Sequence, residues 1–468
     1  MKTNVDEKLS KELENVYNIK SSAKAIKKVY GLSEETVRSI SKEKNEPSWI
    51  EEIRTKALKL FYELPDPTWG PDLSLLNIDE IATYVKPNSK EKRTWDDVPG
   101  DIKNVFDKLG IPESEKKSLA GVGAQFDSEV IYHNLEEKMK EKGVIYTNFD
   151  TAIKEYPELL KKYFTKIVPL IDHKYIALHY ALFSGGSFIY IPKNTKLDLP
   201  LQSYFRLNEK GAGQFEHTLI IVDEGSSLEF IEGCSAPGYN DINLHAGCVE
   251  LYVAKNATLK FSTIENWSKN MLNLNTKKCL VEEGGKIEWI MGSFGSKISM
   301  LYPLAVLNGN NSICEFTGLS FAGKGQNLDT GIKVVHNAIN TKTIVNSKSI
   351  SKDGGVCTFR SNVIVKNNAK KSNINLSCES LMLDSISRSD TIPVSNIQNN
   401  DTLFSHEASV GKISEEAIYY LKTRGLSEED AKKVIVQGFA EPIAKSFPIE
   451  YAVEMNRLIN LELDGTIG

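Results

Sequence analysis

The chain has 468 residues, 41% of them hydrophobic and 25% charged, and a formal net charge of −5. This length exceeds that of one ordinary domain, and the composition is that of a globular protein with a sizeable core. The small negative charge excludes the basic footprint of a nucleic-acid-binding protein and gives no reason to expect an anionic membrane as a partner. We therefore expect binding to neither nucleic acid nor membrane.

The N-terminal stretch MKTNVDEKLSKELENVYNIK lacks the apolar core of a signal peptide, and no later segment approaches about eighteen unbroken apolar residues. We expect a cytoplasmic protein. The six cysteines form no C-x-x-C pair, which argues against a zinc ribbon and against a thioredoxin-like motif. In a reducing compartment they should be free thiols.

Residues 1–185 are predicted to be mainly helical. In GLSEETVRSISKEKNEPSWIEEIRTKALKLFYEL, Ser33 has the position of a helix cap and precedes acidic residues and a helical apolar period that runs through Trp49 and Phe61. The proline-rich stretch LPDPTWGPDLSLL interrupts this pattern. Helical signals then continue as far as KYIALHYALFSGGSF.

Residues 186–410 are predicted to be a β-domain, because short β-runs alternate there with Gly and Asn turns. A turn followed by two apolar residues spaced by two recurs in GSSLEF, NATLKF, GGKIEW, NNSICEF and GGVCTF. The first apolar residues of the first four copies, Leu228, Leu259, Ile287 and Cys314, are 31, 28 and 27 residues apart, and the fifth copy follows after 43. A β-solenoid has such a loose period. The pattern alone leaves a solenoid and a β-sandwich or barrel equally open.

Residues 411–468 are predicted to be helical again. Ser414 caps SEEAIYYLKTRG, which ends at Gly425, and Ser427 caps LSEEDAKKVIVQGF. A third helix is expected in PIEYAVEMNRLINLEL.

Three stretches carry candidate ligand chemistry: FIEGCSAPG with Cys234, NINLSCESLMLD with Cys378, and SHEA with His406 and Glu407. Strand alternation puts both sulfurs on the inward face, where most free cysteines are simply buried. Cys378 and Glu407 lie 29 residues apart, close to the recurring period, so they could stack about 4.8 Å apart and share a metal. Alternation then turns His406 away, unless a bulge intervenes.

The stretch GLSFAGKG is one residue away from a phosphate-binding loop. Gly325 stands where a Ser or Thr hydroxyl would hold magnesium, and no helix is expected after it. We expect no nucleotide hydrolysis by this chain itself.

Long stretches also carry a resemblance to a known family. WDDVPGDIKNVFDKLGIPESEKKSLAGVGAQFDSEVIYHN, QFEHTLIIVDEGSSLEFIEGCSAP, HEASVGKISEE and PIEYAVEMNRLINLELDGTIG resemble the SufB/SufD family of the SUF iron–sulfur cluster assembly system, and within it the SufB scaffold subunits. The similarity runs through nearly the whole chain. It implies a mainly β fold, a right-handed parallel β-helix core flanked by helical N-terminal and C-terminal regions, and so favours the solenoid.

The resemblance further implies a scaffold and not an enzyme. Such a scaffold accepts persulfide sulfur from a cysteine desulfurase through a SufE- or SufU-type carrier. It builds a transient iron–sulfur cluster, expected to be [4Fe–4S], for transfer to apo-proteins. The implied partners are the ABC-type ATPase SufC, docked on the C-terminal helices, and either SufD or a second SufB copy. A reduced flavin in the complex is a further implied cofactor.

The site residues follow from the same resemblance, position by position. Cys234 in EGCSAP matches the sulfur acceptor, and Cys378 matches the cysteine that accepts sulfur and binds the nascent cluster. Glu407 in SHEA matches a ligand of the cluster and its metal, with His406 in a weaker role.

Two alternative functions remain open from the sequence. A carbohydrate-active β-helix enzyme would need three or more acidic groups in one groove, and no such group can be assigned from the sequence. A purely structural assembly subunit would need no site of its own, and Cys378 and Glu407 argue against it.

Overall fold

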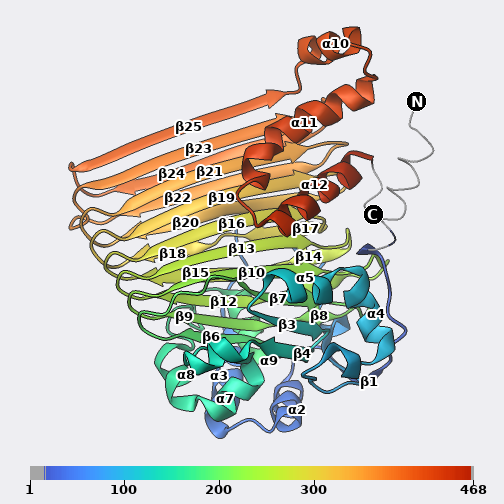
Figure 1. Cartoon of the computed structure of the whole chain (residues 1–468), viewed down its shortest axis with the longest axis vertical. Helices are drawn as coiled ribbons and strands as arrows, with labels where there is room; N and C mark the ends of the chain where they lie inside the picture. Colours follow the sequence, from blue (N-terminus) through green and yellow to red (C-terminus); the bar gives the residue numbers. More distant parts are fainter. Residues whose placement is uncertain (1–14, 16, 465–468) are drawn as a thin grey trace.

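Two long β-sheets form the body of the molecule, which confirms the predicted mainly β fold with a β-solenoid between helical ends (Figure 1). The structure is a computed structural model and describes residue 15 and residues 17–464. The outermost parts of the predicted terminal regions, 1–14, 16 and 465–468, lie outside the described residues.

The first sheet contains the first four copies of the recurring pattern in register. Leu228 pairs with Leu259, which pairs with Ile287, which pairs with Cys314. The fifth copy lies in the other sheet, where Cys357 pairs with Leu328, and this explains its different spacing. The strands of the first sheet, in hydrogen-bonded order, are β25 (Thr402–Lys412), β23 (Ser372–Met382), β21 (Lys342–Ser351), β19 (Ile313–Ala322), β16 (Lys286–Phe294), β13 (Thr258–Asn266), β10 (Ser227–Ser235), β7 (Leu201–Arg206), β3 (Gly121–Phe126) and β4 (Glu129–Leu135).

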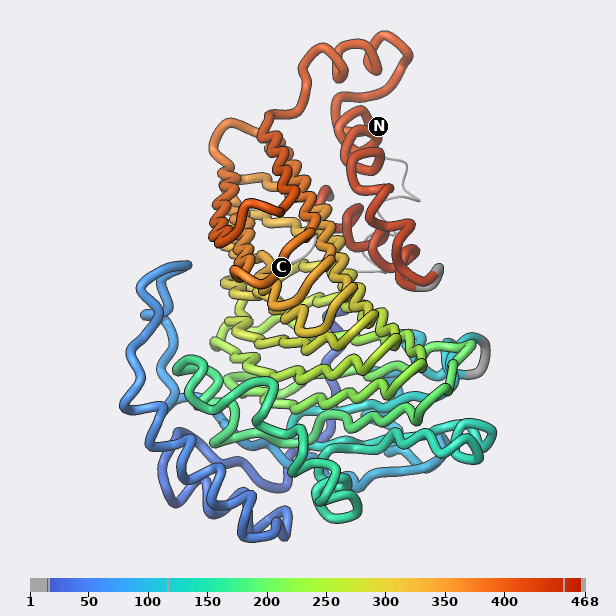
Figure 2. Tube along the Cα trace, turned by 90° about the vertical axis from the view of Figure 1, so that its left-hand side faces the viewer, coloured from blue at the N-terminus to red at the C-terminus, as the bar shows by residue number. Residues whose placement is uncertain are grey.

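The second sheet changes shape along the stack. In the earlier coils two separate strands share each turn, and from β20 onward they merge into one strand, which pairs with both β17 and β18. Figure 2 shows the resulting stack of coils from the side. The strands are β5 (Ile145–Asn148), β6 (Gly186–Ile191), β9 (His217–Val222), β12 (Cys248–Val253), β15 (Thr276–Val281), β18 (Leu304–Leu307), β20 (Asn327–His336), β22 (Val356–Val365) and β24 (Arg388–Ile397), with the shorter β17 (Ile298–Leu301), β14 (Met271–Asn273), β11 (Asn243–His245) and β8 (Gly213–Gln214).

Stacked aromatic side chains fill the middle of the coils. Phe230, Phe261 and Trp289 occupy equivalent positions on three neighbouring strands, and the centroids of adjacent rings lie 5.4 and 5.3 Å apart. Burying a large apolar side chain contributes about 1.5–3 kcal/mol. Each coil obtains this contribution only when a neighbouring coil covers it, so the stack is stable as a whole.

The N-terminal region combines helices with strands. Its strands β3, β4 and β5 extend the two sheets, so the sheets continue across the boundary predicted at residue 185. The division at 185 and 410 stays a prediction. The remaining elements are β1 (Ala25–Tyr30), α2 (Glu34–Lys44), α3 (Ser48–Glu63), η1 (Ile78–Glu80), β2 (Ala82–Pro87), η2 (Trp95–Asp97), α4 (Gly100–Lys108), α5 (Ile111–Ser118), α6 (Glu137–Glu141), α7 (Phe149–Glu155), α8 (Pro157–Tyr163) and α9 (Lys174–Leu182).

The first predicted helical stretch is divided into two helices. Ser33 caps α2 as predicted, because its hydroxyl accepts a hydrogen bond from the Thr36 N–H. The helix ends at Asn45, which has a left-handed φ of 50°, and α3 begins after Pro47. Asn tolerates this conformation and Pro favours a helix start, so the break is encoded locally.

The C-terminal region forms α10 (Glu415–Thr423), α11 (Glu428–Ala444) and α12 (Ile449–Asp464), and Ser414 and Ser427 cap the first two as predicted. Helices α11 and α12 lie along the outer face of the first sheet, whereas α10 projects beyond its last strand (Figure 1). No helix of the described chain is long and apolar enough to cross a membrane.

Candidate functional site

Cys378 lies on β23, one strand from the open edge of the first sheet. Its side chain faces the interior of the coil together with Ile374 and Leu376, as strand alternation predicted. The residue is 2% exposed, and burial raises the pKa of its thiol to about 11. Iron binding at this sulfur therefore has to displace a proton.

The register between β23 and β25 contradicts the predicted placement of Glu407. The pairing is parallel and unbroken, and it sets Leu376 opposite His406, Ser377 opposite Glu407, and Cys378 opposite Ala408. The coil is thus one residue longer than the prediction assumed, and a slip of one residue exchanges the two faces of a strand. Glu407 is exposed on the outer face, and His406 shares the inward face with Cys378.

His406 offers an unused ligand atom near Cys378. The residue is half-buried, and its Nε2 atom is shielded from solvent without a hydrogen-bond partner among the described residues. One strand spacing and two residues along the strand separate it from Cys378, which places the two Cα atoms roughly 8 Å apart. A cluster of several atoms can span the gap between two side chains that point the same way.

Cys234 is enclosed at the end of β10. It is 1% exposed and packs in one apolar cluster with Phe205, Trp267 and Met271. These apolar neighbours cover the thiol, so a sulfur carrier cannot reach it in this conformation. Burial raises the pKa of the Cys234 thiol well above its usual value.

Buried charged side chains surround Cys234, and Lys277 is the central one. Its ammonium forms an ion pair with Glu232 and lies 4.0 Å from Glu265, inside the coils. Burial lowers the pKa of Lys277, but the two carboxylates outweigh it and raise that pKa overall. In turn, Glu232 and Glu265 raise the pKa of Cys234 further, whereas Lys277 lowers it. The ammonium is therefore the group that favours a sulfur anion here.

The charged network continues to a buried histidine. Asn273 donates hydrogen bonds to Glu265 at 2.5 Å and to Ser299 at 3.0 Å, and its amide oxygen accepts from His245 Nδ1 at 2.7 Å. His245 Nε2 donates to Glu216 at 2.5 Å. Sequence reasoning missed this network, although Glu265 is the cross-strand partner of Cys234. Polar residues at inward-facing strand positions were the available signal.

A second group of potential ligands lies on the outside of the coils. His179, His217 and Cys248 have ligand atoms within 4.8 Å of one another, and among the described residues they alone form such a group of three or more His, Cys, Asp or Glu side chains. Neither Cys378 nor Glu407 belongs to it. No short motif singles out these three residues, because they come from a helix and two strands that only the fold brings together.

Fold and side-chain chemistry together define a β-solenoid protein with thiol groups inside its coils. The description "SUF system FeS cluster assembly, SufBD core domain" matches residues 205–439, and "SufBD protein N-terminal region" matches residues 27–203. Iron-sulfur cluster assembly SufBD family proteins of Staphylococcus haemolyticus (strain JCSC1435) and Staphylococcus aureus (strain MRSA252) are each 52% identical over 438 residues, which is 94% of this chain and 94% of theirs. The chain belongs to the SufBD family, which acts in iron–sulfur cluster assembly.

Proposed function

We propose that this chain is a SufB-type scaffold, on which an iron–sulfur cluster is assembled and from which it is passed to apo-proteins. The observation that carries the proposal is the pair Cys378 and His406 on the inward face of the last coils, with the His406 Nε2 atom buried and unpartnered. Thiolate and imidazole are ligands of iron–sulfur centres. A cluster held by only a small number of protein ligands is released more readily than one held by a full set.

Glu407 enters this proposal as a ligand from outside the coil. Its position on the outer face of β25 means that it cannot share an ion with Cys378 through the same face of the strand. A carboxylate there would instead contact a cluster at the open edge of the sheet. The family resemblance supports this role, and the register favours His406 as the closer companion of Cys378.

Sulfur would enter at Cys234. The Cys234 sulfur attacks the terminal sulfur of the carrier's persulfide, the carrier's S–S bond breaks, and a new S–S bond forms on Cys234. The carrier leaves as its thiol and takes up the proton that Cys234 gives up, so the exchange is balanced. Lys277 would stabilise the sulfur anion during this step. Because Cys234 is 1% exposed, the exchange requires local opening of the coil end.

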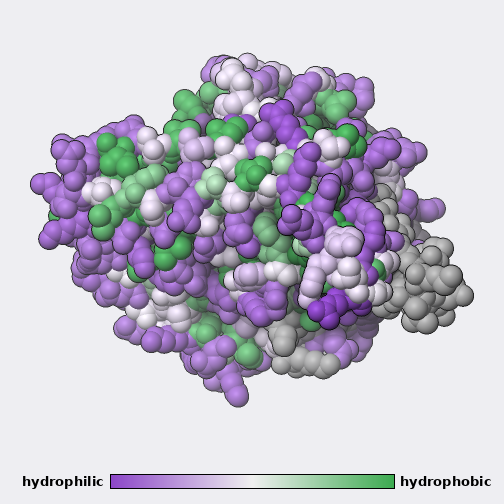
Figure 3. Space-filling view, turned by 90° about the horizontal axis from the view of Figure 1, so that it is seen from above, coloured by the Kyte–Doolittle hydropathy of each residue, from purple (hydrophilic) through white to green (hydrophobic). Residues whose placement is uncertain are grey.

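The open end of the solenoid would bind a second subunit of the same family, SufD or a further SufB copy. Among the described residues, no strand pairs with the outer side of β25, and an unpaired strand edge is a template for pairing. Leu403 and Val410 on β25 and Val394 on β24 are exposed there. Figure 3 views this end and shows apolar patches between polar ones.

The ABC-type ATPase SufC would dock on the C-terminal helices and supply ATP hydrolysis. Tyr419 and Tyr420 on α10 are 70% and 57% exposed on a helix that projects from the solenoid. Exposed tyrosines are common anchors in protein interfaces. A cytoplasmic location, a [4Fe–4S] cluster, a SufE- or SufU-type carrier and a reduced flavin in the complex complete the proposal.

The carbohydrate-active alternative finds no support in the placement of the acidic groups. Glu216, Glu232 and Glu265 do lie near one another, but they are 3%, 0% and 0% exposed inside the coils. A polysaccharide needs an open groove. An experiment distinguishes a purely structural subunit from a scaffold.

That experiment is anaerobic reconstitution of the full chain, together with its ATPase, with iron and sulfide. We expect visible absorption of a cluster and its transfer to an apo-ferredoxin. A structural subunit would bind the ATPase and give neither signal.

A further inference from the structure

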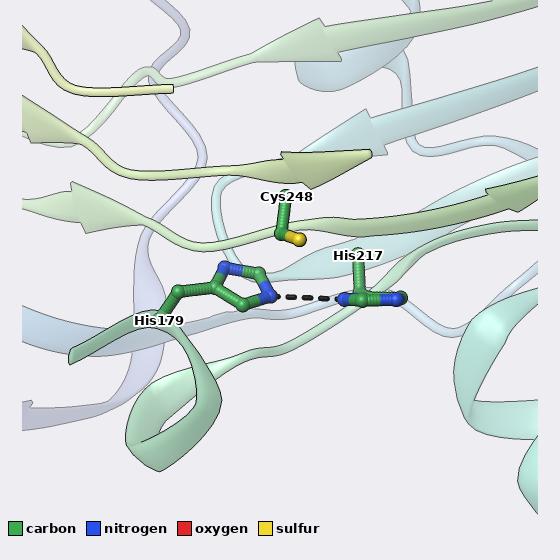
Figure 4. Close-up of side chains that lie close together, drawn as sticks. All are labelled: His179, His217 and Cys248. Carbon is green, nitrogen blue, oxygen red and sulfur yellow. Dashed lines mark hydrogen bonds between the residues drawn. The ribbon is translucent and has the colours of Figure 1, made fainter. Parts of the chain in front are cut away.

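His179, His217 and Cys248 meet between the N-terminal helices and the second sheet. His217 and Cys248 are the first residues of β9 and β12 and pair in register, so their side chains leave the sheet on the same face. His179 projects from α9 onto that face. Figure 4 shows the Cys248 sulfur beside the contact between the two imidazole rings. All three residues are 0% exposed.

The two imidazoles contact each other through single nitrogen atoms. His179 Nε2 lies 3.0 Å from His217 Nδ1. Two nitrogens bound to one zinc ion at about 2.0–2.1 Å with a tetrahedral angle lie roughly 3.3 Å apart. The observed spacing therefore needs only a small outward shift of the rings to admit an ion.

The outer nitrogen of each imidazole lies beside an oxygen. His179 Nδ1 donates to the Ala246 carbonyl at 2.8 Å, and His217 Nε2 lies 3.3 Å from a carboxylate oxygen of Glu250. Metal-binding histidines characteristically donate their second N–H to such a carbonyl or carboxylate. Glu250 is itself fixed by the backbone N–H groups of Thr165, Ile167 and Val168, at 3.0, 3.1 and 2.7 Å.

With Glu250 ionised and both imidazoles neutral, the arrangement without a metal ion leaves a buried nitrogen unsatisfied. The Ala246 carbonyl takes the only proton of neutral His179, so His179 Nε2 presents a lone pair to His217. If His217 donates from Nδ1, its Nε2 is bare beside Glu250, and that Nε2 atom indeed has no hydrogen-bond partner among the described residues. If His217 donates from Nε2, two lone pairs face each other. A metal ion between the rings satisfies both nitrogens.

We propose that His179, His217 and Cys248 bind one soft-to-borderline transition metal ion, of the zinc or copper(I) class. Thiolate and imidazole together select these ions over magnesium or calcium. Phe149 and Phe164 pack against His217 with ring centroids 4.5 and 4.8 Å away, so the site is closed to substrates.

The role of this ion is structural. It would join α9 to the edge of two successive coils and so hold the N-terminal helical layer on the solenoid. The inference is independent of the proposed scaffold function, because Cys248 lies in the second sheet and Cys378 in the first. The metal-free alternatives place one extra proton on Glu250 or on His217, so that His217 Nε2 and Glu250 share a hydrogen bond. Metal analysis distinguishes them from a bound ion.

The test is elemental analysis of the full chain, purified anaerobically before any cluster is reconstituted, for zinc, copper and iron. We expect about one metal ion per chain, retained in Cys378→Ala and in Cys279→Ala. Cys279 is a matched control, since it is also 0% exposed and lies on the neighbouring strand β15. Cys248→Ala should lower the amount of bound metal at least about tenfold, because loss of a direct ligand weakens binding more than loss of an outer-sphere partner does. The element found distinguishes zinc from copper.

A second measurement keeps the test decisive if Cys248→Ala does not fold. Wild-type chain produced in cobalt-containing medium should show thiolate-to-cobalt charge-transfer absorption, and X-ray absorption should give one sulfur and two imidazole nitrogens around the ion. Wild-type chain with no stoichiometric metal, or a cobalt spectrum without a thiolate band, would overturn the proposal. Metal content unchanged in soluble Cys248→Ala would overturn it as well.

Discussion

His406 carries the least satisfied atom near the proposed cluster site. A buried polar atom without a partner costs about 1–3 kcal/mol, and its Nε2 atom, on the same face as Cys378, has none among the described residues. Ligation of a cluster would recover this cost. Glu407, on the opposite face, is exposed and has no such deficit.

The comparison of His406→Ala with Glu407→Ala follows from this difference. We expect His406→Ala to lower the iron bound after reconstitution at least as much as Glu407→Ala does, and Glu407→Ala to unfold within about 0.5 kcal/mol of wild type. Bound iron and urea unfolding are measured on the same preparations. Full cluster loading in His406→Ala together with complete loss in Glu407→Ala would show that the outer face carries the site.

Cys234 is predicted to be unreactive until the coil end opens. Its burial and raised pKa should leave it unmodified by iodoacetamide in the native isolated chain at neutral pH, whereas a charged sulfur carrier should place persulfide on it in the assembled complex. Mass spectrometry of peptides reports both reactions, with Cys279 as an equally buried control. Equal persulfide on Cys234 and Cys279 would contradict a specific acceptor.

The C-terminal helices divide into a covering part and a projecting part. Met455 on α12 is 0% exposed and belongs to one core with Ile264 and Ile290 of the first sheet. Met455→Ala should therefore destabilise the chain by about 2–5 kcal/mol. Tyr419→Ala with Tyr420→Ala should leave the unfolding free energy unchanged and weaken binding of the ATPase. Undiminished ATPase binding by the double variant would place the docking surface elsewhere.

The hairpin between β3 and β4 carries a pH-dependent group. Asp127 has a φ of 53°. Burial raises the pKa of its carboxyl to about 7, although hydrogen bonds from the backbone N–H groups of Glu209 and Asn208 lower that pKa. Its unfolded pKa is about 3.9. The folded state therefore holds a proton that the unfolded state has lost. Its contribution to stability is complete below about pH 4 and disappears as the pH rises through 7.

Asp127→Asn tests that contribution, because Asn tolerates positive φ and carries no charge. Relative to wild type, the variant should gain unfolding free energy between pH 5 and pH 8 in urea titrations. Asp353→Asn is the control, at a φ of 54° on the surface. A difference between Asp127→Asn and wild type that is the same at both pH values would refute the buried proton.

The repeat, the capping serines and the inward direction of Cys378 follow from local pattern, which is why the sequence predicts them. The direction of Glu407 does not, because one residue added to a coil reverses it, and the spacing of the recurring pattern itself varies from 27 to 31 residues. Lys277 beside Cys234 and the His179, His217 and Cys248 group depend on which strands become neighbours. No short stretch of the sequence determines which strands pair over such long distances.

Three regions follow one another along the length of the solenoid. The N-terminal layer closes one end, the polar interior around Cys234 lies in the earlier coils, and Cys378 lies in the last ones beside an unpaired edge. Each coil depends on its neighbours, so a substitution inside one coil weakens the stack without changing its topology. A scaffold can therefore lose its site and keep its fold.

Mössbauer spectroscopy of the anaerobically reconstituted chain, with Cys378→Ala compared with Cys314→Ala, decides whether Cys378 holds the nascent cluster. Cys314 is 0% exposed and faces inward in the same sheet, so each variant should lose only about 1–2 kcal/mol of stability and keep its ATPase. We predict a cluster spectrum in wild type and Cys314→Ala and none in Cys378→Ala. A wild-type spectrum from soluble Cys378→Ala would contradict the central claim that this cysteine holds the nascent cluster.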